Sequence, residues 1–452
     1  MKKRLSFNQN LLIGSLLFGL FFGAGNLIFP VQMGQQAGNH AFTATIGFLI
    51  TGVGLPILGI IASALSKSES LFDMAKPVSS KYSTIFTCLL YLTIGPLFAI
   101  PRTATVAFEV GIHPFISDEY LKIGLIIFSF IFFAITIYFS LKPGQILDWV
   151  GRYLTPIFLV LLSVLLIATF ISPMGHANNY AAQGNYVAQP LFTGLLDGYN
   201  TMDALASVAF SIIIISNIQK LGVKDSNSIA IETCKSGLVS VVGMAIIYAS
   251  LAYMGATSLG SVSRADNGGT ILSLVSNHYF GIVGQVLLAA IVGVACVKTA
   301  IGLITSCAEM FSEMFPKTVS YKKYAIAFTL FSFVIANFGL SNLIKFSIPV
   351  LMFLYPLVIT LILLSLLAPF INKQSDIYKW TTGLTVVAAF FDLLKALPQP
   401  LAGNAVVTKL VTFATSYLPG YNYGFGWVIP ALCGFIIGLI IWVVGGKNNN
   451  AI

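Results

Sequence analysis

The chain has 452 residues, of which 57% are hydrophobic and only 9% are charged. Soluble globular domains carry about 25% charged residues, so this composition excludes a soluble protein and indicates one embedded in a membrane. A net charge of +9 would suggest nucleic-acid binding in a soluble chain, but the placement of the basic residues points to the membrane instead.

Twelve stretches are long and apolar enough to cross a bilayer as helices, which takes about 20 residues. In chain order they cover roughly 8–30, 41–65, 82–108, 122–141, 153–172, 191–216, 236–257, 279–313, 324–342, 346–370, 380–397 and 426–446. The third and eighth are longer than a perpendicular crossing needs, so we expect them to tilt. The segments between spans are too short for a soluble domain, so we expect a single membrane domain over residues 1–452.

The distribution of Lys and Arg predicts the orientation of these spans. If the N-terminus is cytoplasmic, 17 of the 24 basic residues fall on the cytoplasmic side. Two more, Arg102 and Lys298, lie inside spans. Those left for the outer side are Lys122, Arg264, Lys345, Lys395 and Lys409. We therefore expect a multi-pass protein with both termini in the cytoplasm.

The third and eighth spans share a pattern that indicates an internal repeat. Arg102-Thr103-Ala104 in the third matches Lys298-Thr299-Ala300 in the eighth, and Pro156 and Pro356 in the fifth and tenth spans have a similar offset. An odd number of spans in each repeat inverts the second copy, which is typical of secondary transporters. The predicted parts are a first five-helix repeat over 1–172, a second over 191–370, and two extra helices over 380–446.

The first and sixth spans, which correspond in such a repeat, are both interrupted by polar and helix-weakening residues. They read FGAGNLIFP at 22–30 and LLDGYNTMDALASVAF at 195–210. Unwound backbone in hydrocarbon survives only where its N–H and C=O groups find partners, and paired interruptions are a pointer to a transport site. Free N–H groups at the start of a half-helix suit an anion, and free carbonyls suit a cation. The alternative is that the small residues permit close helix packing.

Gly23-Ala24-Gly25-Asn26 followed by Phe29-Pro30 resembles the first span of the LeuT-type fold. That fold is an all-α membrane protein with a 5+5 inverted repeat and discontinuous helices 1 and 6. More closely, GPLFAIPRTATVAFEVG (95–111) and DGYNTMDALASVAF (197–210) are similar to the branched-chain amino acid:cation symporter family of the BrnQ type. The resemblance covers essentially the whole chain. It implies import of leucine, isoleucine and valine by sodium symport and alternating access through a bacterial inner (plasma) membrane.

The resemblance also implies a binding site shared by the two interruptions. Backbone N–H groups of residues 23–25 would bind the substrate carboxylate, carbonyls of residues 199–203 would bind its ammonium group, and aromatic rings would wall an apolar pocket. The residues implied for the substrate are Phe21, Phe22, Gly23, Ala24, Gly25, Tyr199, Asn200, Thr201 and Asp203. Those implied for sodium, the expected co-transported ion, are Asn26, Thr299, Thr305 and Ser306, which offer hard oxygen ligands. Asp203 has an alternative role as the cap of a half-helix.

The two basic residues inside spans are rare and energetically expensive in a membrane. Arg102 has either a gating role or a structural one, paired with Glu109 or a carbonyl. Lys298 is either a structural charge, which snorkels to the interface or pairs with a carboxylate such as Glu309, or a replacement for a sodium ion. In the second case coupling at that position would be lost or taken over by protons. Relatives of the wider fold carry an arginine gate just before Phe-Pro, where this chain has Ile28, so its outer gate must differ.

Other function classes find less support in the sequence. An ion channel needs a continuous polar lining, whereas these spans are mostly apolar. The chain has no HExxH, GxSxG or GxxxxGK[ST] motif, so neither an intramembrane enzyme nor an ATP-driven pump is expected. We expect an amino acid substrate and the lipid bilayer as partners, with no organic cofactor and no nucleic acid. The oligomeric state stays open.

Overall fold

The computed structural model describes residues 4–68, 70–265 and 267–449, and within them the chain is helical and contains no β-strand. Its α-helices are α1 Phe7–Phe21, α2 Ala24–Ala37, α3 Ala41–Leu49, α4 Leu55–Leu65, α5 Leu71–Ala75, α6 Ser80–Leu92, α7 Ala99–Gly111, α8 Leu121–Ser140, α9 Thr155–Ile171, α10 Pro190–Tyr199, α11 Asp203–Lys220, α12 Ser226–Ser258, α13 Gly268–Met314, α14 Tyr321–Ala336, α15 Leu340–Leu366, α16 Ala368–Ile371, α17 Ser375–Lys395, α18 Ala405–Tyr417 and α19 Val428–Asn449. Wider π turns lie at Ile50–Gly54, Thr93–Leu97 and Leu147–Leu154. Short 3₁₀ turns lie at Gly38–His40, His113–Phe115, Asp118–Tyr120, Pro143–Gln145, Ala177–Asn179, Gly184–Tyr186, Leu401–Gly403 and Tyr421–Tyr423.

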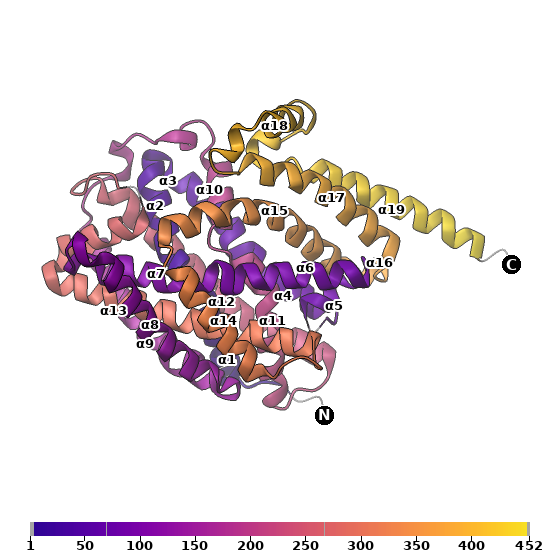
Figure 1. The fold of residues 1–452 in the computed structure, drawn as a ribbon, viewed down its shortest axis with the longest axis horizontal. Helices are drawn as coiled ribbons and strands as arrows, with labels where there is room; N and C mark the ends of the chain where they lie inside the picture. Colours follow the sequence, from indigo (N-terminus) through magenta and orange to yellow (C-terminus); the bar gives the residue numbers. More distant parts are fainter. Residues whose placement is uncertain (1–3, 69, 266, 450–452) are drawn as a thin grey trace.

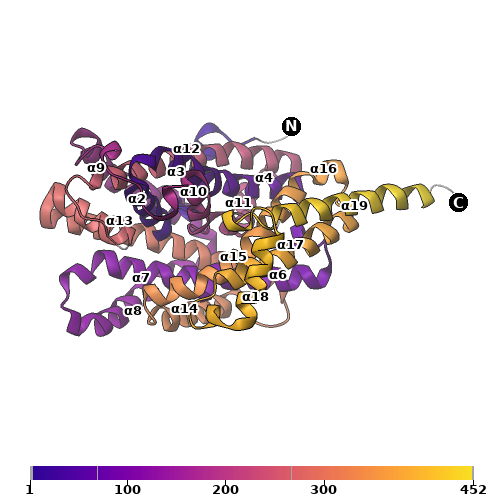
Figure 2. The same ribbon diagram turned by 90° about the horizontal axis from the view of Figure 1, so that it is seen from above.

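Most of the long helices run along the long axis of the molecule and pack as one bundle (Figures 1 and 2). Helices α7 and α11 are buried along almost their whole length, so they form the centre of the bundle. Helices α17 and α19 lie side by side at one edge, and α19 projects beyond the other helices (Figure 1).

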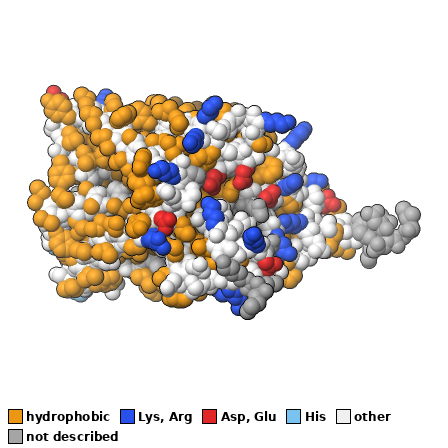
Figure 3. Space-filling view, turned by 90° about the horizontal axis from the view of Figure 1, so that it is seen from below, with side chains coloured by type: hydrophobic (Ala, Val, Ile, Leu, Met, Phe, Trp, Pro, Cys, Tyr) orange, Lys and Arg blue, Asp and Glu red, His pale blue; other side chains and the backbone are white. Residues whose placement is uncertain are grey.

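The outer surface of the bundle is apolar over a wide area. Ile127 on α8, Val160 on α9 and Leu330 on α14 are among many exposed hydrophobic side chains. Figure 3 shows such side chains covering much of one face, while most of the Lys and Arg side chains in this view lie outside the largest apolar area. Monomeric soluble proteins rarely expose apolar patches of this extent, so this surface fits contact with lipid.

Eight helical stretches in the described part of the chain are long and apolar enough to cross a membrane. They are Ala24–Leu65, Ser80–Phe115, Asp118–Ser140, Leu147–Ile171, Pro190–Lys220, Asn227–Ser258, Gly268–Met314 and Leu340–Leu366. Phe7–Phe21 and Val428–Val444 are shorter apolar helices. Each of the twelve predicted spans overlaps a helix, but the number of crossings, their orientation and the 5+5 repeat stay predictions.

Both predicted interruptions are present, and the two longest spans carry breaks that the sequence analysis did not anticipate. The first span divides into α1 and α2, and the sixth into α10 and α11. Within the third, Gly95 has a non-helical backbone (φ −95°, ψ −125°) between α6 and α7, next to Pro96. The eighth kinks at Gly281, whose φ of 57° suits glycine because it has no Cβ.

Helices α2 and α12 approach each other closely through two glycines. A Cβ added at Gly34 would collide with the backbone of Ala252, and one added at Gly255 would collide with the backbone of Val31. Small residues at such crossings let helix backbones come into direct contact in a membrane. This contact fixes α2, the second half of the broken first helix, against a long unbroken helix.

Gly255→Ala should therefore destabilise the protein. The new methyl group must displace backbone rather than a flexible side chain, and overpacking of this kind costs about 1–3 kcal/mol. The matched control is Gly383→Ala on α17, where an added Cβ meets no atom within 4 Å and the change should stabilise the helix by about 0.5–1 kcal/mol. Thermal unfolding of both detergent-solubilised variants measures the difference, and equal melting temperatures would contradict the tight α2–α12 contact.

Candidate functional site

The first helix breaks because its backbone must pass close to α13. Helix α1 ends at Phe21 and is capped by Phe22, Gly23 has an extended backbone (φ −109°, ψ −162°), and α2 begins at Ala24. A Cβ on Gly23 would lie 3.0 Å from the Thr299 hydroxyl oxygen, tighter than ordinary van der Waals contact. The Gly23 N–H donates to the Asn26 side-chain oxygen at 3.0 Å, which closes the first turn of α2.

The second break separates α10 from α11. Helix α10 ends at Tyr199, and α11 begins at Asp203. Between them Met202 adopts a left-handed conformation with φ 64°, which is uncommon for a residue other than glycine and stores strain. The Thr201 hydroxyl donates to the Gly198 carbonyl at 2.9 Å, so the side chain adds a bond to a carbonyl at the end of α10.

The two breaks meet at a buried polar junction formed by Asn26, Asp203 and Tyr248. The Asn26 amide donates to Asp203 Oδ2 at 2.6 Å, and the Tyr248 hydroxyl donates to the same oxygen at 2.7 Å. The Asn26 amide also contacts the Tyr248 hydroxyl. All three side chains are at most 2% exposed. The junction therefore joins the start of α2, the start of α11 and the middle of α12.

The junction lines one side of a small central cavity of about 30 Å³. Ligand pockets for small molecules usually measure about 300–1,000 Å³, so the walls must separate before a molecule larger than water can enter. The predicted residues that line the cavity are Phe21, Gly23, Ala24, Gly25, Asn26, Arg102, Thr201, Asp203 and Thr299. Its apolar walls include Leu20, Ile94, Phe210 and Leu303, which the sequence analysis did not name.

Arg102 projects from α7 to the second break. Its Nη1 donates to the Asn200 carbonyl at 3.2 Å, and its guanidinium lies 5.6 Å from the centre of the Phe29 ring. Glu109, considered as a partner for Arg102, instead contacts His113 at 2.7 Å. Arg102 lines both the central cavity and a second cavity of about 260 Å³, here called the vestibule, which Phe29 and Asn200 also line. The arginine thus stands between two cavities.

Lys298 projects from α13 to the first break. Its Nζ donates to the Gly19 carbonyl at 3.0 Å and to the Phe22 carbonyl at 2.5 Å. The ammonium also lies 4.6 Å from the centre of the Phe158 ring, a distance typical of cation–π contacts. The side chain is 0% exposed, so the partners of this charge are the carbonyl end of α1 and an aromatic wall, and not Glu309.

The other predicted residues lie away from the central cavity. Phe22 packs on Phe158 with ring centres 5.1 Å apart, and Tyr199 stacks on Tyr355 at 4.3 Å. The Ser306 hydroxyl donates to a carbonyl of α11 at 2.9 Å. Thr305 is six residues from Thr299, about 9 Å along the helix. Asn26 and Thr299 are thus brought together at the central cavity, whereas Thr305 and Ser306 lie further toward the C-terminal end of α13.

Tyr248 is the junction member that the sequence analysis missed. It lies in the middle of a long apolar helix, where one tyrosine has no distinguishing neighbour in the sequence.

Asn10 on α1 is a second residue whose role had no signal in the sequence. Its amide donates to Glu232 Oε2 at 2.8 Å and its oxygen accepts from the Ser236 hydroxyl at 2.8 Å.

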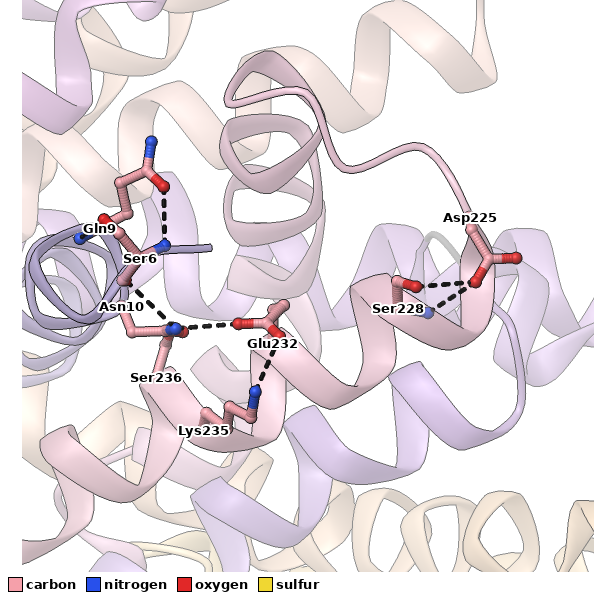
Figure 4. A network of polar contacts seen from close by, with 8 residues as sticks. All are labelled: Ser6, Gln9, Asn10, Asp225, Ser228, Glu232, Lys235 and Ser236. Atoms are coloured by element: carbon pink, nitrogen blue, oxygen red, sulfur yellow. Dashed lines mark hydrogen bonds and ion pairs between the residues drawn. The ribbon is translucent and has the colours of Figure 1, made fainter. Parts of the chain in front are cut away.

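Figure 4 shows these contacts as part of a network between α1 and α12, here called the α1–α12 network. Lys235 adds an ion pair with Glu232 at 2.9 Å. Ser6 caps the start of α1, where its hydroxyl accepts from the Gln9 N–H at 3.2 Å. The network fixes the first half of the broken helix against α12 at the end opposite the break.

The residues offer oxygen ligands for a small hard cation rather than a transition-metal site. Among the described residues there is no cluster of three or more His, Cys, Asp or Glu side chains. At the central cavity, the Thr299 hydroxyl is buried and has no hydrogen-bond partner within the described chain. It lines this cavity together with the Asn26 amide and the Asp203 carboxylate, a set of donors that suits a cation preferring oxygen.

The comparisons with known proteins agree with this architecture. Residues 6–444 match the family model for branched-chain amino acid transport proteins. The chain is 49% identical over 449 residues to the branched-chain amino acid permease BrnQ of Lactobacillus delbrueckii subsp. lactis, covering 99% of this chain and 100% of the relative. It is 37% identical over 442 residues to the branched-chain amino acid transport system 2 carrier protein of Pseudomonas aeruginosa, covering 98% of each.

Two solved structures share the fold. Mhp1, a nucleobase-cation-symport-1 family transporter in a closed conformation, superposes with a TM-score of 0.60 at 13% identity over 97% of this chain and 93% of its own. MhsT in complex with L-phenylalanine gives 0.57 at 15% identity over 98% and 99%. At these identities the likeness concerns the fold alone, which is that of the LeuT-like transporters.

The named relatives are permeases and carriers and not enzymes. Together with the apolar helices, they identify a multi-pass membrane protein. The chain belongs to the family of branched-chain amino acid transport proteins.

Proposed function

We propose that this protein imports leucine, isoleucine and valine by alternating access, with sodium as the co-transported ion. The observation that carries the proposal is the meeting of two broken helices at one cavity, where the first turn of α2 and a buried carboxylate line the same space. We further propose the 5+5 inverted repeat, twelve crossings, and a bacterial plasma membrane with both termini in the cytoplasm. The excess of Lys and Arg on one side of the predicted spans supports that orientation.

The charges at the two ends of the substrate match groups that line the cavity. The N–H groups of Ala24 and Gly25 belong to the first turn of α2, where a helix lacks internal acceptors and attracts anions, so they suit the α-carboxylate. The Asp203 carboxylate and the carbonyls of the second break suit the α-ammonium. The branched side chain needs only the apolar wall, and because one methylene is worth about 1–3 kcal/mol there, all three amino acids should be accepted.

For a substrate to reach the central cavity from either side of the membrane, a contact on that side must break. On one side Arg102 stands between the central cavity and the vestibule. On the other, the α1–α12 network fixes the first half of the broken helix. We propose that these two places are the outer and inner gates, which open in turn while the junction of Asn26, Asp203 and Tyr248 stays near the bound substrate.

We place the co-transported sodium beside this junction. The Asn26 oxygen uses one lone pair for the Gly23 N–H and keeps a second. Asp203 supplies negative charge, and the Thr299 hydroxyl supplies a neutral oxygen. Thr305 and Ser306 remain predicted ligands that would need a separate ion.

A second candidate function is amino acid transport that is coupled to protons or independent of sodium. It is favoured by Lys298, whose ammonium bonds the Gly19 and Phe22 carbonyls at the end of α1. Carbonyls at the end of a half-helix are where a transporter of this architecture coordinates a cation. Under this hypothesis the lysine replaces an ion that other members of the fold would bind.

Leucine binding to purified protein, and its uptake into proteoliposomes, with sodium or with potassium, separates the two functions. Sodium should raise the apparent affinity for leucine by about 5- to 150-fold, the usual range for coupled ligands, and an inward sodium gradient should drive uptake. Identical binding and uptake in the two salts would contradict sodium symport and support the second candidate.

Lys298→Thr tests the ion-replacement role in the same assay. Loss of the ammonium leaves two carbonyls that sodium can coordinate, so leucine uptake should become more steeply dependent on sodium than in the unmodified protein. Lys379→Thr on α17 is the matched control, because Lys379 is exposed. If both variants keep the original sodium dependence, Lys298 is a structural charge.

Tyr248→Phe tests the junction. It removes one donor to the Asp203 carboxylate, and a lost hydrogen bond to a charged group costs about 1.5–3 kcal/mol, so leucine binding should weaken by roughly 10- to 100-fold. The control is Tyr378→Phe, which deletes a buried hydroxyl bonded to the Leu364 carbonyl outside the cavity. Equal affinities in the two variants would exclude Tyr248 from the site.

Asn10→Ala tests the inner gate. Without the bonds to Glu232 and Ser236, α1 should open more often and its backbone amides should exchange hydrogen faster, while those of α15 keep their rate. Asn8→Ala, an exposed position on the same helix, is the control. Unchanged exchange in α1 would mean that other contacts hold this helix in place.

A further inference from the structure

A cavity separate from the central one lies between α10, α15, α17 and the loop before α19. Its volume is about 320 Å³, which is within the range of small-molecule sites and about ten times that of the central cavity. Asn185, from the loop between α9 and α10, also lines it. We call this space the outer cavity, because its lining loops fall on the predicted outer side.

A buried carboxylate faces this outer cavity without a donor. Asp392 on α17 is 8% exposed, and its carboxylate accepts no hydrogen bond from any part of the chain that the structure describes. The other buried aspartate, Asp203, accepts two. The Asp392 oxygens open to the cavity rather than to a donor in the described chain, so this side chain is suited to a ligand that brings N–H donors.

A cation lies one helical turn away. Lys395 Nζ donates to the Tyr421 carbonyl at 3.1 Å and lies 4.8 Å from the centre of the Tyr421 ring. Tyr421, in the loop before α19, thus fixes the Lys395 ammonium group in place. An ammonium group has three N–H donors, and the Tyr421 carbonyl uses one of them, so two remain for a ligand. The cavity thus presents a carboxylate and an ammonium group from two side chains that lie three residues apart on α17.

Beside the polar Asn185 and Asn422, much of the remaining wall of the outer cavity is apolar. Leu196 from α10, Met352 from α15 and Trp427 from the loop before α19 all line it. A molecule that matches these surfaces carries a positive and a negative group close together and an apolar side chain. A free amino acid with a hydrophobic side chain has this composition.

We propose that the outer cavity is a second binding site for a zwitterionic, apolar amino acid, in which Asp392 receives the α-ammonium and Lys395 the α-carboxylate. The identity of the ligand as leucine, isoleucine or valine rests on the proposed function. The alternative, that Asp392 and Lys395 are only a structural charge pair, predicts no ligand in this cavity.

The outer cavity is connected to the central site through Tyr199. The Tyr199 ring lines the outer cavity and stacks on Tyr355, whose hydroxyl donates to the Tyr199 carbonyl. Tyr199 is the last residue of α10, directly before the second break. A ligand in the outer cavity therefore bears on the helix end that forms part of the central site, and linkage requires any effect on affinity to be mutual.

Equilibrium binding of radiolabelled L-leucine to the full-length protein in nanodiscs tests this proposal. The unmodified protein should bind two molecules per chain. Asp392→Asn and Lys395→Gln should each weaken one of them by about tenfold or more, the effect of losing a charge-assisted hydrogen bond, and leave the other. Asp376→Asn and Lys379→Gln, at exposed positions of the same helix, should keep both.

Met352→Trp narrows the outer cavity without changing a charge and should also remove one molecule, so the test does not depend on a single variant. One leucine per chain, with the same isotherm in Asp392→Asn and Lys395→Gln, would overturn the outer site while leaving the transport function intact. Loss of both molecules and of uptake in Asp392→Asn and Met352→Trp alike would overturn it as a separate site. Absence of leucine uptake by the unmodified protein would overturn the proposed function itself.

Discussion

Two buried cations stabilise the two helix breaks that form the central site. A helix that ends in an apolar interior leaves carbonyl groups without partners, each at a cost of several kcal/mol, and its end carries partial negative charge. Lys298 bonds the carbonyl of Phe22, the residue directly after α1, and Arg102 bonds the carbonyl of Asn200, the residue directly after α10. Each contact lowers the free-energy cost of burying both the charged side chain and the helix end that it bonds.

These two contacts are arranged crosswise between the halves of the chain. Arg102 on α7, in the first half, bonds the broken helix of the second half, and Lys298 on α13, in the second half, bonds the broken helix of the first. The proposed inverted repeat accounts for this exchange, because it relates the third span to the eighth and the first to the sixth. Neither half of the chain completes its own break, so the central cavity forms only when both halves are packed together.

The sequence could predict the breaks because each has a local cause. Glycines, a proline and polar residues within apolar spans mark places where a helix is weak, and both interruptions lie where FGAGNLIFP and GYNTMD indicated. The family resemblance added Asn26 and Asp203 to one site, and the structure places them in direct contact. Local composition is therefore sufficient for those parts of the site that depend on the backbone of one segment.

The parts that could not be predicted depend on distant partners. Arg102 was expected to pair with a carboxylate or a carbonyl, and Lys298 to pair with a carboxylate or to replace a sodium ion. The spacing of residues could not decide, because a backbone carbonyl has no signature in the sequence. Tyr248 lies 45 positions from Asp203 along the chain, in a helix whose other residues are ordinary for a membrane span. The break at Gly95 was likewise hidden, since tilt explains a long span equally well.

The fixed position of Lys298 bears on how transport can be coupled to an ion. Because this ammonium is part of the chain, the Gly19 and Phe22 carbonyls stay satisfied in every state in which the contact persists. An ion cannot be required at that place for the site to close. At the junction, by contrast, the donors to Asp203 are the neutral Asn26 and Tyr248, so this is one place where an ion can act. A co-transported cation, a proton or the ammonium of the substrate can each bring positive charge to the Asp203 carboxylate.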